Sequence, residues 1–419
     1  MSQWLEQVID AAKGVNDYLA PVRQQALAKL EQDGWPRGRN EAWRFTPLTA
    51  VKDRAAVTET TLRQTDAPVI EGLGAIDLVF VDGRLATDLS AISLPDGLDI
   101  VALDNANDAI QARISAVFGQ IKPQRHLFGL VNDVLCQQGV FINVKAGCVV
   151  EAPVRIVNIA SQNVDAHTRV LVNLEAQSRL TVVEHGCGDV DSLTTAFAEY
   201  VIGEKARLEH YRLAMFTGKA KHVGGSHFSL QDESRLNSTL VGYGSELSRL
   251  DVDIIHAGEH AKAKMNAIYL LAEGELFDLH STIEHAVPNG TTEENARGII
   301  GDRARAVFNG RIHIHRDAQK TLAELNNRNL LLSRRGIINT KPELEIYADD
   351  VQCAHGATVA EIEEKALYYL LSRGIERSKA LVMLNFGFIQ ELVNAMPNEA
   401  LRDWLSPQLS ERFVTMEVK

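Results

Sequence analysis

The sequence predicts a mainly β protein in which a β-solenoid is flanked by helical segments. Three observations support this fold class. From about residue 126 to 350, short apolar strands recur between turn residues, with no convincing helical stripe. Within that region, a strand–turn unit repeats every 27 or 28 residues. Before and after it, apolar residues recur at helical spacing.

Each repeat has an acidic turn, a small residue, a basic residue and then an apolar one. The small residues are spaced 28, 28 and 27 apart, at Ser178, Ala206, Ser234 and Ala261, and the segment 302–306 continues the pattern. This regularity is typical of stacked coils, in which the small residue lets the chain turn close to its neighbour and the basic residue points to solvent. An ordinary antiparallel sandwich is the alternative. No hexapeptide run favours a left-handed solenoid.

The N-terminal part is predicted to be helical and then mixed. Residues 1–34 contain two helices, the second of which begins at Ala20-Pro21 and ends before Gly34. A loop rich in Pro, Gly and Arg covers residues 35–48. Residues 50–120 are expected to hold a short strand, a tight turn and a helix, at Asp77–Val81, Asp82-Gly83 and Ala106–Phe118.

The C-terminal part is predicted to form a helical hairpin and a third helix. Thr358 and Glu361 have the spacing of a capping box, so a helix should begin there and end at Arg373-Gly374. A second helix is expected over Glu376–Met396 and a third over Asn398–Leu405. The hairpin carries more apolar surface than its own packing needs, so part of it should contact another protein. The expected contact residues are Tyr368, Leu371, Leu381, Leu384 and Phe388.

These patterns divide the chain of 419 residues into three expected domains. They are a helical and mixed domain at 1–120, the solenoid at 121–355 and a helical domain at 356–419.

Composition excludes several classes of function. The net charge of −12 argues against non-specific binding to nucleic acid or to an anionic membrane. No apolar run reaches the roughly 20 residues that span a bilayer, and no signal peptide is visible, so a cytoplasmic protein is expected. The sequence has no P-loop and no Gly-x-Ser-x-Gly, so it offers no basis for ATP binding by a P-loop or for serine hydrolase chemistry.

The four cysteines are widely spread and include no CxxC pair. In a cytosolic chain they should be reduced, and no permanent cluster site can be built from local sequence. Core positions are expected for three of them: Cys136, Cys148 and Cys187.

The most informative segment is 341–358, which contains Cys353 and His355. In an extended chain, residues two apart point to the same side, so a thiolate and an imidazole should share one face at the end of a strand, followed by Gly356 and a helix start. This pair suits iron, zinc or copper, or the handling of sulfur. Two ligands do not close a site, so further groups must come from elsewhere, including another chain. The alternative is a buried structural cysteine and a histidine that is hydrogen-bonded at a helix start.

The segment Asp349-Asp350-Val351-x-Cys353-x-His355-Gly356-Ala357-Thr358 closely resembles the SufB/SufD family of iron–sulfur cluster assembly scaffolds, in its D-type form. A second match is Trp35-Pro36-x-x-x-x-Glu41-x-Trp43-Arg44-Phe45-Thr46-Pro47-Leu48. The resemblance covers the whole chain in order. The shortness of the chain and its few cysteines also fit the D-type rather than the B-type subunit.

The resemblance implies a right-handed parallel β-helix and a non-enzymatic scaffold subunit. It further implies pairing with a SufB-like subunit at the end of the β-helix near residue 350 and docking of a SufC-like ABC ATPase on the C-terminal hairpin. His355, supported by Cys353, would contribute to a transient iron–sulfur cluster at the subunit junction. The isolated chain would carry no cofactor and could form a homodimer through the same end.

Two other readings come from different functional classes. The first is a homodimeric metal-binding protein that uses histidine-rich strands, with His313 and His315 as a pair on one face. The second is a β-helix carbohydrate-active enzyme. Such enzymes line a groove with carboxylates and aromatic residues, whereas this chain is only 6% aromatic and shows no carboxylate pair.

Overall fold

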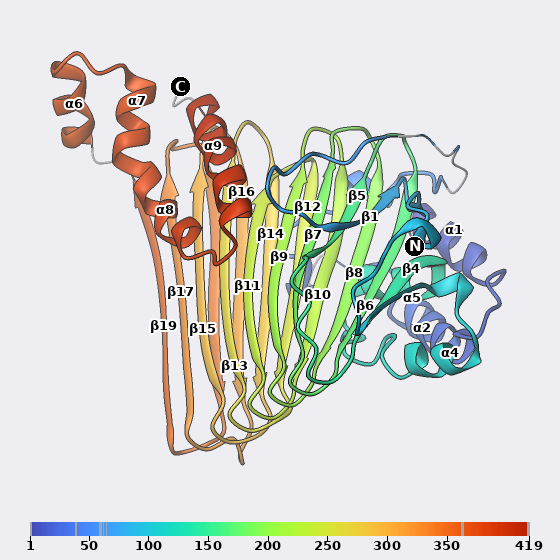
Figure 1. Cartoon of the computed structure of the whole chain (residues 1–419). Helices are drawn as coiled ribbons and strands as arrows, with labels where there is room; N and C mark the ends of the chain where they lie inside the picture. Colours follow the sequence, from blue (N-terminus) through green and yellow to red (C-terminus); the bar gives the residue numbers. More distant parts are fainter. Residues whose placement is uncertain are drawn as a thin grey trace.

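The structure is a computed structural model and describes residues 2–37, 40–57, 61, 63, 65–361 and 364–416. Its centre is a parallel β-solenoid of two facing sheets (Figure 1). One sheet has ten strands in the order β19-β17-β15-β13-β11-β9-β7-β5-β1-β2, and the other has nine in the order β18-β16-β14-β12-β10-β8-β6-β4-β3. Each coil therefore gives one strand to each sheet. The solenoid prediction is confirmed and the antiparallel sandwich is wrong.

The strands of the solenoid are nearly uniform in length. They are β4 Gln138–Val144, β5 Val154–Ile159, β6 Asp165–Leu174, β7 Arg179–Gly188, β8 Leu193–Ile202, β9 Arg207–Phe216, β10 Lys221–Leu230, β11 Arg235–Tyr243, β12 Leu247–His256, β13 Lys262–Leu271, β14 Leu276–His285, β15 Thr291–Ile300, β16 Arg305–Ile314, β17 Thr321–Leu331, β18 Ile337–Ile346 and β19 Val351–Glu361. Alternate side chains of both sheets meet between the sheets and form the main apolar core.

The 27–28-residue repeat marks one corner of successive coils. The four small residues are fully buried there, and the residue before each one has a positive φ: Gln177, Lys205, Glu233 and His260. The backbone N–H of Gln177 donates to the carbonyl of Glu204 in the next coil at 2.8 Å. The basic residues that follow are exposed, as predicted, at Arg179, Arg207, Arg235 and Lys262. Ala304 of the fifth segment is also buried, but it lies at the opposite corner, before β16.

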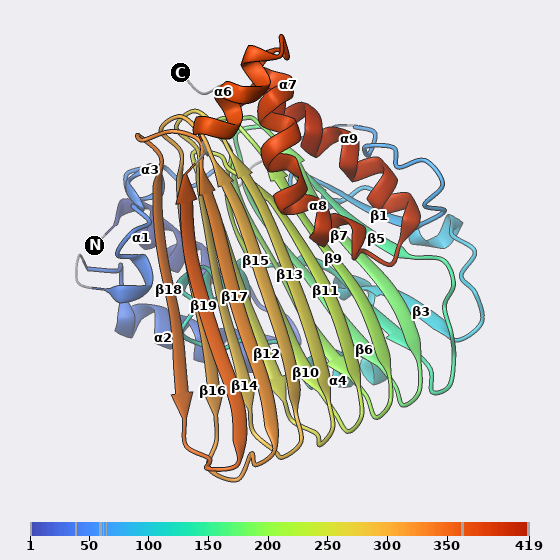
Figure 2. The same cartoon turned by 90° about the vertical axis from the view of Figure 1, so that its left-hand side faces the viewer.

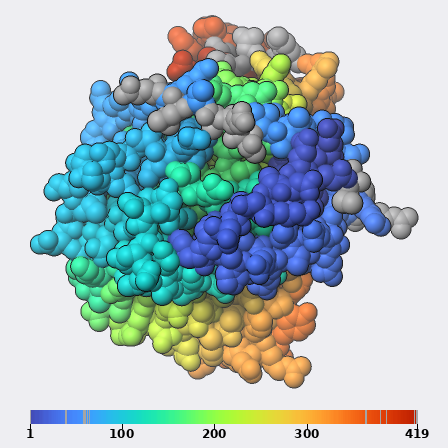
Figure 3. Space-filling view, turned by 90° about the vertical axis from the view of Figure 1, so that its right-hand side faces the viewer, coloured from blue at the N-terminus to red at the C-terminus, as the bar shows by residue number. Residues whose placement is uncertain are grey.

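The N-terminal elements close one end of the solenoid and cover the outer face of the nine-stranded sheet (Figure 3). The helices are α1 Gln3–Ala12, α2 Ala20–Asp33, α3 Thr49–Lys52, α4 Asp108–Ser115 and α5 Leu127–Leu135, with short 3-10 turns η1 Glu41–Trp43, η2 Leu89–Ala91 and η3 Leu103–Asn105. Strands β1 Ile76–Val81, β2 Arg84–Leu85 and β3 Leu98–Ala102 extend the two sheets. Trp4 of α1 is fully buried and its indole N–H donates to Asp165 at 2.7 Å.

The helix α5 was not expected, because residues 126–350 were predicted to contain strands only. Its residues from Leu127 to Val134 are buried on all sides, so the segment shows no one-sided apolar stripe. It lies between α2 and the sheet, where it contacts β6, β8 and β10.

The C-terminal helices are α6 Glu364–Ser372, α7 Arg377–Leu381, the π-helical turn η4 Val382–Phe386, α8 Gly387–Asn394 and α9 Glu399–Thr415. Figure 2 shows α8 and α9 lying across the ten-stranded sheet, and a second apolar cluster joins them to its outer face. The predicted capping box is wrong, because β19 continues through Thr358 to Glu361. The predicted second helix is divided at η4, and the third is longer than expected. Within the described residues, no helix has the length and apolar character needed to span a membrane.

Candidate functional site

The last coil of the solenoid exposes the edges of both sheets. Strand β18 is hydrogen-bonded to β16 and strand β19 to β17, and the sheet orders place no described strand beyond either of them. Apolar side chains lie exposed along this end, including Ile337, Ile346, Tyr347 and Val359. Unpaired strand edges present free backbone donors and acceptors, so this end is a ready template for another strand.

Cys353 and His355 lie within β19. Cys353 is in register with Ala323 of β17, and His355 with Leu325. Both β17 residues are fully buried in the core between the sheets. Residues at the same register position point the same way, so Cys353 and His355 both face the interior side of the outermost coil.

The shared face of Cys353 and His355 was predicted, whereas their position at a turn before a helix was not correct. They lie in the first half of an eleven-residue edge strand. Cys353 is partly buried and packs against the core, and His355 is exposed. The two side chains therefore form the border between the core and the open end.

The electrostatic setting keeps Cys353 as a thiol. Burial raises the pKa of Cys353, while a hydrogen bond with the backbone of Ala323 acts in the opposite direction. A metal ion would have to displace the thiol proton, because thiolate is the form that binds metal. In the part of the chain that the structure describes, no group of three potential metal ligands includes Cys353 or His355.

The other sequence candidates lie elsewhere. Burial raises the pKa of Cys136 and of Cys187 to about 11, so these are poor nucleophiles. His313 and His315 have ring centroids 4.7 Å apart, but each faces its own carboxylate: His313 Nδ1 lies 2.9 Å from Glu345, and His315 Nε2 lies 2.5 Å from Glu284.

The expected contact residues of the C-terminal helices differ in exposure. Tyr368 is 74% exposed and Leu384 is 36% exposed, with the neighbouring Tyr369 and Met383 also exposed. Leu371 and Phe388 are partly buried, and Leu381 is only 4% exposed. The exposed apolar residues are therefore Tyr368 and Tyr369 of α6 and Met383 and Leu384 of η4, and we call these four residues the α6–η4 patch. In Figure 1, α6 and α7 project past the end of the sheets.

Two family descriptions match nearly the whole chain. Residues 157–388 match the SUF system FeS cluster assembly, SufBD core domain, and residues 5–156 match the SufBD protein N-terminal region. The chain belongs to the SufB/SufD family. The core-domain match includes the open end, both Cys353 and His355, and the α6–η4 patch.

Curated relatives of the family place this member nearer to the D type. The iron–sulfur cluster assembly protein SufD of Escherichia coli is 30% identical, over 94% of this chain and 93% of that protein. The chloroplastic protein ABCI7 of Arabidopsis thaliana is 26% identical, over 96% of this chain and 88% of its own length. The iron–sulfur cluster assembly protein SufB of Bacillus subtilis is 24% identical, over 67% and 61%. This chain is thus a SufD-like member of an iron–sulfur cluster assembly family.

Proposed function

We propose that this chain is a non-enzymatic scaffold subunit of a SUF iron–sulfur cluster assembly complex and pairs with a SufB-like subunit through β18 and β19. The observation that carries the proposal is the unpaired end of the solenoid. Both sheets end there with exposed apolar residues and with Cys353 and His355 on the inner side. A homologous subunit with an equivalent end would continue both sheets across the junction.

In this proposal the nascent cluster is cargo held at the junction. His355 supplies an imidazole from this chain, and Cys353 supplies a thiolate or relays sulfur beside it. The remaining ligands come from the partner, since two donors do not close a site. The isolated chain therefore holds no cluster.

The α6–η4 patch is the proposed docking surface for a SufC-like ABC ATPase. The sequence has no P-loop of its own, so ATP-driven motion would have to come from a partner. The patch is apolar and exposed, and it is connected to β19 through α6. Movement of these helices upon ATPase closure would be transmitted to the strand that carries Cys353 and His355.

Replacing Leu384 with aspartate is expected to abolish ATPase binding, because it places a charge in the middle of an apolar contact. The change should leave the fold intact, since Leu384 is 36% exposed. Binding of the purified ATPase to wild-type and variant chains by biolayer interferometry checks this. Val414→Asp is the matched control, as Val414 is an exposed apolar residue on α9, outside the patch. Retained binding in Leu384→Asp, or equal loss in Val414→Asp, would place the docking site elsewhere.

The proposed function as a whole is tested by isolating the tagged chain from its host under anaerobic conditions. Recovery of an ABC-type ATPase together with a cysteine-richer homologue is the expected result. A homodimer with stoichiometric metal and no other protein would favour the alternative of an independent metal-binding protein. The same open end could support that homodimer, because its edges are also able to pair with a second copy.

A further inference from the structure

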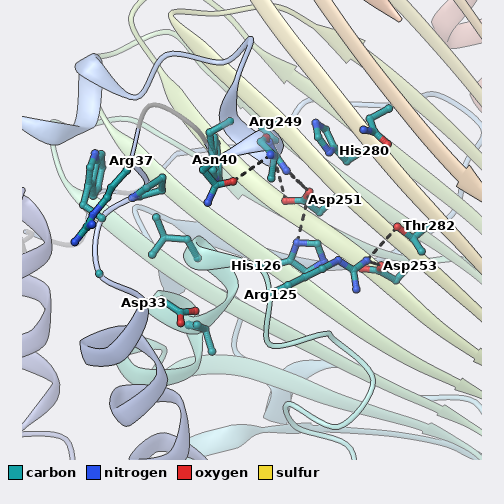
Figure 4. A pocket seen from close by; sticks show the side chains of 18 of the residues that line it. Asp33, Arg37, Asn40, Arg125, His126, Arg249, Asp251, Asp253, His280 and Thr282 are labelled. Carbon is teal, nitrogen blue, oxygen red and sulfur yellow. Dashed lines mark hydrogen bonds and ion pairs between the residues drawn. The ribbon is translucent and has the colours of Figure 1, made fainter. Parts of the chain in front are cut away.

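A separate cavity of about 670 Å³ lies between the N-terminal segment and the outer face of the nine-stranded sheet. Residues 32–37 and 40–43 form its roof, the start of α5 forms one wall, and β12 and β14 form its floor (Figure 4). Trp35, Pro36 and Trp43 of the second family-like motif found in the sequence therefore line this cavity. The guanidinium of Arg249 lies 4.0 Å from the ring of Trp43 and holds that roof to the floor.

Three potential metal ligands converge here. His126 and Asp253 line the cavity, and the fully buried His227 contacts Asp253. His126 Nε2 lies 2.8 Å from Asp253 Oδ2, and His227 Nδ1 lies 2.8 Å from the same oxygen. One donor atom from each of the three residues falls within 4.8 Å of the others, and all three residues are buried. Within the described residues this is the one group of three such ligands.

The fold places the three side chains by two routes. His227 of β10 and Asp253 of β12 are directly opposite one another in the parallel ladder, so their side chains share the outer face of the sheet. His126 is the N-cap residue of α5, and α5 packs on that face. Two ligands thus lie on strands and the third is held at the start of a helix, which favours a fixed geometry.

A second layer of charged groups orients the first. Asp251 Oδ1 lies 3.6 Å from His126 Nδ1, the ring nitrogen that points away from Asp253. Arg249 fixes Asp251 by an ion pair of 2.8 Å. Arg125 pairs with Asp253 Oδ1 and leaves Oδ2 for the two histidines. Metal-binding histidines commonly have such a carboxylate behind the ring, which sets the tautomer and the ring orientation.

The spacing of the donors is close to what one ion needs. Zinc binds histidine nitrogen and carboxylate oxygen at about 2.0–2.2 Å in a tetrahedron, so neighbouring ligand atoms lie roughly 3.3 Å apart. The two contacts of 2.8 Å would open by about half an ångström, as the ion replaces two hydrogen bonds to Asp253. His126 can then carry its proton on Nδ1, facing Asp251. In His227 the ion would bind Nδ1, so the proton of that ring would sit on Nε2. Nε2 has no hydrogen-bond partner, so no contact outside the group prevents this tautomer.

We propose that His126, His227 and Asp253 bind one divalent transition-metal ion of the zinc or iron(II) class, with a fourth position open to the cavity. Two imidazoles and one carboxylate suit both ions. Arg125, which pairs with Asp253 and contacts Thr282, lines the cavity beside the group and suits a water molecule or a small anion as the further ligand. This site is distinct from the open end of the solenoid and does not depend on the scaffold proposal.

The test is a titration of the isolated full chain, stripped with a chelator, with Zn²⁺ in air and with Fe²⁺ under anaerobic conditions. One ion should bind per chain, with Zn²⁺ tighter than Fe²⁺, as the usual order of divalent affinities predicts. Co²⁺ is a spectroscopic probe, and visible bands of a tetrahedral N₂O environment are expected.

Variants separate this site from weak surface binding. Asp253→Asn keeps the side-chain shape and should weaken Zn²⁺ binding by more than roughly 100-fold, as should His126→Ala. Asp251→Asn leaves all three ligands in place and should weaken binding about 10- to 100-fold. His315→Ala is the control, because this partly exposed histidine also faces a carboxylate but lies outside the group.

Equal Zn²⁺ affinity in the wild type, Asp253→Asn and Asp251→Asn would overturn the proposal and leave a purely hydrogen-bonded trio. The proposal would also be overturned if the wild type bound Zn²⁺ and Fe²⁺ no more tightly than Asp253→Asn does. A fall in affinity in His315→Ala equal to that in the ligand variants would assign the ion to the pair of His313 and His315. Thermal unfolding of each apo variant checks that the chain is folded before titration.

Discussion

Replacing His355 with alanine is expected to leave the fold intact and to reduce iron–sulfur cluster assembly on the complete complex by about 10-fold or more. His355 is exposed on an edge strand, so alanine removes no core packing. The change removes the imidazole that faces the proposed junction. Even residues that only support a metal ligand change affinity or activity by about 10- to 100-fold, so loss of a ligand should cost at least that much.

The measurement is the amount of iron and acid-labile sulfide bound per complex after anaerobic reconstitution. Thr358→Ala is the matched control. Thr358 is an exposed residue of the same strand, and its odd spacing from His355 places it on the opposite face. Wild-type cluster content in His355→Ala, with intact subunit pairing, would remove His355 from the site.

Acidification is expected to unfold the chain between about pH 6.5 and pH 4. Burial lowers the pKa of His185 and of His285 from 6.5 to about 4. Both rings carry a buried Nδ1 without a hydrogen-bond partner, so burial outweighs any nearby stabilisation of the charged form. Burial also lowers the pKa of His167 to about 4 and lowers the pKa values of four further histidines: His210, His222, His227 and His256.

The direction follows from proton binding. The unfolded chain takes up these protons near pH 6.5, and the folded chain resists them until about pH 4. Stability is therefore complete above pH 6.5 and is lost as the pH falls towards 4. At pH values below 4, each of His185 and His285 lowers the free energy of unfolding by about 3 kcal/mol. The two losses together approach a typical total stability of about 5–15 kcal/mol. Glu294 acts in the opposite sense, because burial raises its pKa to about 7, and burial also raises the pKa values of Asp165, Glu209 and Glu275.

Urea unfolding at a series of pH values measures this effect. His285→Asn should reduce the dependence of the unfolding free energy on pH, by up to one proton between pH 4 and 6.5, whatever its stability at pH 7. His260→Asn is the control, because His260 is exposed at a corner with φ +57° and asparagine tolerates that conformation. A pH dependence that is the same in His285→Asn and the wild type would contradict the assignment.

The solenoid could be predicted from sequence because its corners are locally specified. A residue with a positive φ followed by a fully buried small residue recurs once per coil, as at Lys205-Ala206 and Glu233-Ser234. The close approach of neighbouring coils excludes larger side chains there, so the constraint appears directly in the sequence.

Two elements were mispredicted because tertiary contacts outweighed local signals. Thr358 and Glu361 satisfy the spacing of a capping box, yet both pair with β17, in register with Arg328 and Leu331. Ladder hydrogen bonds with an existing sheet thus extend the strand past a helix signal. Helix α5 was missed because it gives no helix signal in the sequence. Burial on every side removes the apolar periodicity that marks a surface helix.

The two candidate sites differ in how visible they are in the sequence. The common face of Cys353 and His355 follows from their spacing alone. His227 and Asp253 are 26 residues apart, close to the coil period, and this interval is the one signal that could have paired them. His126 joins them only through the packing of α5, which no local pattern predicts.

Hydrogen exchange of the chain alone and in complex with a SufB-like subunit tests the central claim most directly. We expect amides of β18 and β19 to become protected upon complex formation, while those of β7 and β9, already paired on both sides, do not change. Protection confined to other regions, with β18 and β19 exchanging as fast as in the free chain, would contradict pairing through the open end.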